Sequence, residues 1–167
     1  MPQSRKLFGR PGETDLVAVD RALAEFRAAR PVLLRQGEEL ALALSAELAE
    51  ADLTARLDSL AAGKARLVLS AARLRRLGAK GRAETGTLAM PAIDLSRIET
   101  LALKLDARVD APVGPANALD NAALELARLA LVLPAVILVP IQAAQVAGEP
   151  LIEVSIEAVN GYRAAQV

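Results

Sequence analysis

The chain has 167 residues, 53% hydrophobic but only 2% aromatic, and its 20 lysines and arginines balance 20 aspartates and glutamates. It contains no cysteine and no histidine, which excludes disulfides, thiolate nucleophiles, imidazole bases and the usual zinc sites. The neutral charge argues against nucleic acid as a partner, and every apolar run falls short of the roughly 20 residues of a membrane-spanning helix. We therefore expect one cytoplasmic domain that does not enter a membrane.

Helix and strand patterns alternate through the first part of the chain, after a leader over residues 1–13 that we expect to be flexible. Apolar residues at helical spacing predict a helix over 14–30, which Pro31 ends. Strands are predicted over 31–35 and 40–44, separated by a turn. The alanine-rich stretch around the second strand also fits a helix, but its leucines alternate as in a strand, which we favour.

Two short helices and a strand are predicted next. Asp52 is placed to cap a helix over 53–63, and a strand follows over 65–70. Ser70 can cap a helix over 71–78. Residues 79–92 contain three helix breakers and no clear period, so we predict a loop, which at that length is usually mobile or functional.

A longer helix is predicted to start at Asp94 and to continue through residue 110, with its apolar residues on one stripe. The residues of this stripe are Leu95, Ile98, Ala102 and Leu105. The segment "APVGPAN" then breaks the helix, because it contains two prolines and a glycine.

The last third of the chain predicts helix, strand, strand and helix. Asn117 or Asp120 is expected to cap the first helix, and Pro134 introduces a strand over 135–141. The core-facing residues of that helix are predicted to be Leu124, Leu126, Ala127 and Leu131. A strand over 148–155 is followed by a helix over 156–166, capped by Ser155.

This alternation predicts an α/β or α+β fold, in which helices cover a mixed sheet. We expect a single domain over residues 14–167. Since the chain ends inside a predicted helix without a stop signal, we expect this domain to be cut from a longer polypeptide.

The order of four segments resembles the 3,4-dihydroxy-2-butanone-4-phosphate synthases of riboflavin biosynthesis. These segments are "ARPVLL", "AELAEADLTARL", "ARLVLSAARLRRLG" and "AALELARLALVLPAVIL". The resemblance implies the fold of that family. The threonylcarbamoyl-adenosine synthesis proteins share this general architecture, the YrdC-like fold, and are an alternative, although their lysine and arginine nucleotide motif is not apparent here.

The functional motifs of the synthase family are not retained at the matching positions. The Arg-x-Gly-His-Thr-Glu motif falls on Ala116, Ala118, Leu119, Asp120 and Asn121. The acidic loop that supplies a magnesium ligand is reduced to Glu38 and Glu39, and adjacent glutamates in a turn are more often simply solvated. The resemblance therefore implies a degenerate site at Glu38, Glu39, Leu119, Asp120 and Asn121, without catalytic residues or a metal.

Two groups of residues are candidates for binding an anion. The family's Asp-Arg-x-x-Thr stretch is partly kept as Arg97 and Thr100, where the arginine could hold a phosphate. The stretch 73–82 concentrates basic residues near glycines, namely Arg73, Arg75, Arg76, Lys80 and Arg82. The competing interpretation, which we favour, is that both groups lie on the solvated polar faces of helices.

The resemblance is nearest to the degenerate synthase-like domain that precedes the catalytic domain in some bacterial GTP cyclohydrolases II. It implies a non-catalytic domain with a role in assembly, positioning or regulation, whose partner is the C-terminal cyclohydrolase domain. Zinc and GTP are expected only in that missing domain, no cofactor is expected in this segment, and a homodimer is a further expected contact. The alternatives are a free-standing phosphate- or RNA-binding module that uses residues 73–82, and a residual synthase acting on ribulose 5-phosphate with Mg²⁺.

Overall fold

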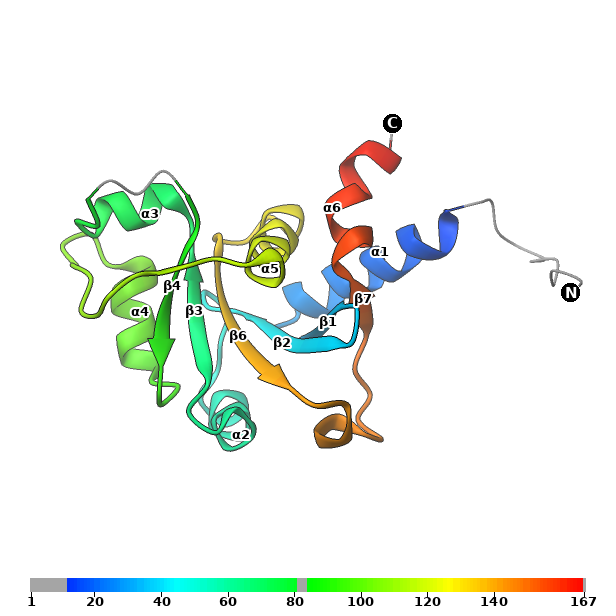
Figure 1. Cartoon of the computed structure of the whole chain (residues 1–167), viewed down its shortest axis with the longest axis horizontal. Helices are drawn as coiled ribbons and strands as arrows, with labels where there is room; N and C mark the ends of the chain where they lie inside the picture. Colours follow the sequence, from blue (N-terminus) through cyan, green and yellow to red (C-terminus); the bar gives the residue numbers. More distant parts are fainter. Residues whose placement is uncertain (1–11, 81–83, 167) are drawn as a thin grey trace, which may run out of the picture.

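The computed structural model of the chain describes residues 12–80 and 84–166, which form a seven-stranded mixed sheet with helices on both faces (Figure 1). In chain order the elements are α1 (Glu13–Arg27), β1 (Val32–Gln36), β2 (Glu39–Ser45), α2 (Ala51–Ala61), β3 (Ala65–Leu69), α3 (Ala71–Arg76), β4 (Gly86–Met90), α4 (Leu95–Leu103), β5 (Gly114–Pro115), α5 (Ala118–Leu129), β6 (Ala135–Ile141), the 3₁₀ helix η1 (Ala143–Val146), β7 (Glu153–Ser155) and α6 (Ile156–Ala165). This architecture confirms the predicted fold class.

The strands are ordered β5-β4-β3-β6-β2-β1-β7 across the sheet. Among the described strands, β1 and β7 pair in parallel and the other neighbours pair antiparallel. The central strand β6 pairs with β2 on one side, where Leu40 lies opposite Ile141, and with β3 on the other, where Arg66 lies opposite Leu138. Consequently the start of β2, the end of β6 and the start of β3 lie close together.

Each face of the sheet has its own hydrophobic core, because successive side chains along a strand point to opposite faces. On β3, Val68 joins the core under α1, α5 and α6, whereas Leu67 and Leu69 join the core under α2, α3 and α4. Figure 1 shows α3 and α4 beside β4 at one end of the sheet, and α1 and α6 near β1 and β7 at the other. Both cores consist mainly of leucine, isoleucine, valine and alanine, as the low aromatic content requires.

Most predicted elements are confirmed. The alternating segment around residues 40–44 is the strand β2, and Ser70, Asp94 and Ser155 cap their helices through side-chain oxygens. Asn117 caps α5, and Asp120 completes a capping box with it, so the two alternatives for this cap are parts of one motif. Residues 1–11 of the predicted leader lie outside the described residues, and Glu13 already belongs to α1.

The predicted loop over 79–92 is wrong in part, because β4 lies within it and pairs with β3 and β5. Gly86 is one of the three helix breakers in this segment, and its role is steric, since a Cβ atom there would lie 2.6 Å from Val113 Cγ1 and 2.8 Å from Leu74 Cδ1. The glycine therefore permits a close approach of β4 to its neighbours rather than interrupting regular structure.

The helix predicted to start at Asp94 ends at Leu103 rather than near residue 110. Lys104 is already extended, and Leu105, predicted to be on the core stripe, has 76% of its surface exposed. Leu101 is buried instead, together with Ile98 and Ala102. The Arg73 guanidinium donates to carbonyl oxygens at the end of this helix, a long-range cap that the local pattern does not reveal.

Leu131 was also predicted wrongly as a core residue. It follows α5 in a left-handed conformation with φ 60° and is 88% exposed. Arg27 donates to the carbonyls of Leu129 and Ala130, so the helix ends against a side chain from α1. The chain can then turn directly into β6.

One helix cap, one strand boundary and two short elements also differ from prediction. Asp52 does not cap α2, because the helix starts at Ala51 and the residue at the cap position, Glu50, makes no capping side-chain hydrogen bond. Of the strand predicted over 148–155, only β7 is formed. The two-residue strand β5 and the helix η1 were not predicted.

No helix among the described residues has the length and apolarity needed to cross a membrane.

Candidate functional site

A cleft with a cavity volume of about 360 Å³ opens where β2, β3 and β6 meet the start of α5. Its lining residues are Glu38, Glu39, Leu40, Arg66, Asn117, Leu119, Pro140, Ile141 and Gln142. The glutamates come from the β1–β2 hairpin, the arginine from β3, and the segment 140–142 from the end of β6. The sheet register explains why segments so distant in sequence converge here.

An ion pair between Arg66 and Asp120 lies beside the cleft. The Arg66 Nε donates to Asp120 Oδ1 at 2.6 Å, and the carboxylate side chain is only 2% exposed. Arg66 stands on the same face of the sheet as α5, because it alternates with Leu67 along β3. A buried carboxylate requires such a partner, since an unpaired buried charge is costly.

The second oxygen of Asp120 is used by the backbone. Asp120 Oδ2 accepts the Asn117 N–H at 2.8 Å, while Asn117 Oδ1 accepts the Asp120 N–H at 3.0 Å. This reciprocal pair satisfies donors at the start of α5 that would otherwise lack partners. Both carboxylate oxygens of Asp120 are therefore committed to the ion pair and the capping box.

The opposite side of the cleft carries the two glutamates of the hairpin. Glu38 and Glu39 are exposed, and the tight turn before them is made possible by Gly37, whose φ is 60°. Within residues 12–80 and 84–166, neither carboxylate has an ion-pair or hydrogen-bond partner. The cleft thus has a cationic wall at Arg66 and an anionic rim at the hairpin.

The structure brings together part of the predicted degenerate site. Glu38, Glu39 and Leu119 line one cavity, and Asp120 is paired with Arg66, which lines the same cavity. Asn121 is exposed and donates its side-chain amide to the Asn117 carbonyl. Across the part of the chain that the structure describes, no three acidic, histidine or cysteine side chains are grouped so that they could hold a metal ion.

Sequence reasoning missed Arg66 as a site residue. The available signal was a single charge inside the otherwise apolar strand "ARLVLS". A charged residue in a buried strand requires a partner, but the sequence did not indicate that the partner would be Asp120, 54 positions away.

The predicted anion-binding cluster over 73–82 is distributed between structural and exposed positions. Arg73 donates to the carbonyls of Leu101 at 2.8 Å, Thr100 at 3.3 Å and Lys104 at 2.6 Å. Burial lowers the pKa of the Arg73 guanidinium, and the nearby charge of Arg76 lowers it further. Its donors are directed at the end of α4 rather than at solvent.

The remaining members of this cluster lie at or beyond the end of α3. Arg75, Arg76 and Lys80 are exposed, and the Arg76 carbonyl accepts a hydrogen bond from Arg108. Arg82 lies outside the described residues. Arg75, Arg76 and Lys80 are not among the residues that line the cleft.

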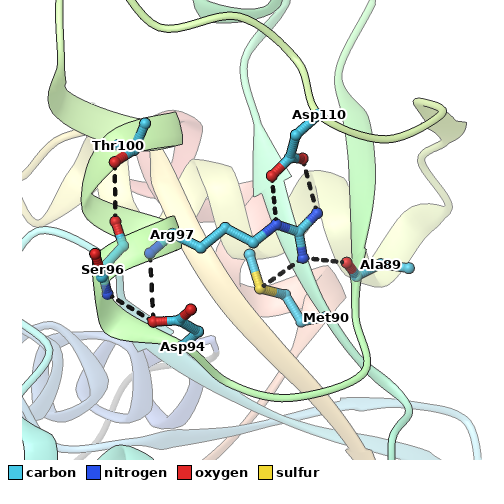
Figure 2. Close-up of polar contacts among 7 residues, drawn as sticks. All are labelled: Ala89, Met90, Asp94, Ser96, Arg97, Thr100 and Asp110. Atoms are coloured by element: carbon cyan, nitrogen blue, oxygen red, sulfur yellow. Dashed lines mark hydrogen bonds and ion pairs between the residues drawn. The ribbon is translucent and has the colours of Figure 1, made fainter.

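Arg97 is held in place by a second ion pair (Figure 2). Its Nε and Nη2 donate to the two carboxylate oxygens of Asp110 at 2.7 and 2.9 Å, and its Nη1 donates to the Ala89 carbonyl at 2.8 Å. This hydrogen-bonded pair lowers the pKa of Asp110 and raises the pKa of Arg97. The Thr100 hydroxyl donates to the Ser96 carbonyl one turn earlier in α4.

No protein-family model matches the chain, and no curated protein matches it. The fold is nevertheless that of solved synthase structures. The two-domain 3,4-dihydroxy-2-butanone 4-phosphate synthase RibBX of A. baumannii is 19% identical with a TM-score of 0.66, and the match covers 87% of this chain and 57% of that one. The Candida albicans synthase is 16% identical with a TM-score of 0.66, over 87% of this chain and 96% of that chain.

A third solved structure, a 3,4-dihydroxy-2-butanone 4-phosphate synthase in complex with two magnesium ions, is 15% identical. Its TM-score is 0.66, and the match covers 88% of this chain and 96% of that chain. The chain therefore has the fold of these synthases, as the resemblance in sequence order implied. It spans 57% of the length of the two-domain A. baumannii protein.

Proposed function

We propose that this chain is a catalytically inactive domain of the dihydroxybutanone-phosphate synthase fold, and that it serves a GTP cyclohydrolase II in riboflavin biosynthesis. The observation that carries the proposal is the use of Asp120. Both of its oxygens are committed, one to Arg66 and one to the Asn117 backbone, so the start of α5 stabilises the fold instead of performing chemistry.

The synthase reaction enolises and rearranges a pentulose phosphate, which requires an acid and a base positioned around a metal-bound enediolate. At the start of α5, Leu119 and Asn121 stand where the family motif has histidine and glutamate. The uncommitted carboxylates of the cleft, Glu38 and Glu39, both come from one exposed turn. This donor set does not fit the magnesium site of the family, and we derive no catalytic step through the metal.

A direct assay tests the loss of activity. The purified chain is incubated with ribulose 5-phosphate and Mg²⁺, and formate release is measured beside an active synthase of the same fold. We expect formate at the level of the buffer blank, because no acid–base pair is available at the start of α5. Enzyme-dependent formate that is lost in Glu38→Gln or Glu39→Gln would instead favour a residual synthase.

The proposed cyclohydrolase partner is tested by reading the gene that encodes this chain. The reading frame beyond Val167 is expected to encode a cyclohydrolase domain with three cysteines that hold zinc. Removing residues 12–167 in frame is then expected to change the assembly state or the GTP dependence of that enzyme, while its zinc content is retained. A reading frame without the three-cysteine pattern would contradict the cyclohydrolase partner.

A further inference from the structure

The cleft presents opposite charges on opposite sides, and we propose that it binds a small zwitterion that carries a carboxylate and an ammonium group. In this arrangement Arg66 receives the carboxylate, and Glu38 and Glu39 receive the ammonium. The inference rests on the proposed function in one respect, since a cleft that performs no chemistry is available for sensing a ligand.

The first argument concerns the unused donors of Arg66. A guanidinium has five N–H donors, and Arg66 donates to Asp120 only through its Nε. Among the described residues its two terminal nitrogens have no partner, although the side chain is only 21% exposed and lines the cavity. Two parallel donors held in this way match the geometry of a carboxylate.

The second argument concerns the net charge of the cleft. Arg66 is already compensated by the buried Asp120, so the lining acts as two negative charges from Glu38 and Glu39. A simple anion on Arg66 would be repelled by these glutamates. An anion that carries its own ammonium group satisfies both sides at once, because the ammonium compensates the glutamates.

The third argument concerns the surface between the charges and the size of the cavity. Leu119, Pro140 and Ile141 also line the cleft, and they suit a short run of methylene groups between the charged ends. A cavity of about 360 Å³ is at the small end of ligand sites. The ligand class is therefore a small amino-acid-like molecule rather than a nucleotide or a polymer.

The test is a binding series on the full chain with ω-amino acids from 4-aminobutanoate to 8-aminooctanoate, measured by calorimetry. Hexanoate and hexylamine serve as singly charged analogues of 6-aminohexanoate. We expect one member of the series to bind with one-to-one stoichiometry, and at least tenfold more tightly than the singly charged analogue of matched length. The chain length of the best member reports the span between Arg66 and the glutamates.

Variants locate the site. Glu38→Gln combined with Glu39→Gln changes only exposed positions and is expected to remove the tenfold preference for the zwitterion. Arg66→Met is expected to abolish binding, and the variant Arg66→Met with Asp120→Leu repeats that test without an unpaired buried charge. Arg56→Gln is the matched control, because Arg56 lines a separate groove with Leu53 and Leu57.

Three results would overturn the inference: no saturable binding by any member of the series, equal affinity for hexanoate, or full binding in the Glu38→Gln, Glu39→Gln variant. The formate assay distinguishes this failure from failure of the proposed function. A chain that neither releases formate nor binds a zwitterion refutes the inference alone. A chain that binds the zwitterion and releases formate refutes the proposed function alone.

Discussion

Two arginine–aspartate pairs lie in different regions of the molecule and differ in the burial of the acid. Arg66 and Arg97 have equally exposed side chains, at 21% each, but Asp120 is 2% exposed and Asp110 is 44% exposed. The first pair joins β3 to α5 beside the cleft, and the second joins α4 to the segment before β5 (Figure 2).

The number of contacts and the burial of the acid rank these two pairs in opposite orders. Arg97 makes two contacts with Asp110, whereas Arg66 makes one with Asp120. Exposed pairs contribute little because water solvates each partner when the other is removed, but removal of one partner of a buried pair leaves a charge that water does not reach. We therefore expect the burial of the carboxylate to decide how much unfolding free energy is lost when each pair is broken.

The largest effect is expected for Asp120→Ala, which leaves Arg66 unpaired and removes half of the capping box. We expect the free energy of unfolding to fall by about 3 kcal/mol in urea titrations at pH 7. Asp106→Ala, at an exposed position, is the control and should change stability little. A loss below about 1 kcal/mol for Asp120→Ala would contradict the role given to burial.

A smaller loss is expected when both charges are removed together. Arg66→Met with Asp120→Leu replaces the pair by apolar side chains, and replacement of this kind is often neutral or stabilising in buried sites. The capping contact with the Asn117 N–H is still lost, so we expect a net loss of about 1 kcal/mol. A double-mutant cycle measures the coupling, and additive losses would show that the two side chains stabilise the fold independently.

Asp110→Asn is expected to have a still smaller effect, of about 1 kcal/mol or less, because its carboxylate is partly solvated. Arg97 also keeps its hydrogen bond to the Ala89 carbonyl in this variant. Urea titrations in low salt and in 1 M NaCl measure the difference from the unsubstituted chain. Salt should reduce this difference but leave the effect of Asp120→Ala largely unchanged, and the reverse order would break the comparison.

The smallest effect is the pH dependence of the Asp110 contribution. Arg97 lowers the pKa of Asp110 in the folded chain, so the carboxylate stabilises the fold at pH values above its unfolded pKa. That contribution should be lost as the pH falls from about 4 through the lowered folded-state pKa. The stability difference between the chain and Asp110→Asn, followed from pH 7 to pH 2.5, should therefore shrink at the acid end rather than grow.

Part of the candidate site was predicted, by two different routes. Residue types indicated Asn117 or Asp120 as the cap of α5, and the structure forms that cap. The resemblance to the synthases, rather than any local pattern, assigned Glu38, Glu39 and Leu119 to the site. The pairing of Arg66 with Asp120 could not be predicted, because it depends on the packing of α5 against β3.

The alternation of helices and strands, the residue types of both cores and most of the helix caps follow from the sequence, because apolar periodicity and capping chemistry act over a few residues. The tertiary structure alone decided where α4 and α5 end, since Arg73 and Arg27 reach their last carbonyls from other elements. It also decided that Gly86 lies inside a strand and that Asp120 pairs with Arg66. These features depend on contacts between segments distant in sequence, and the chain must be folded before such contacts exist.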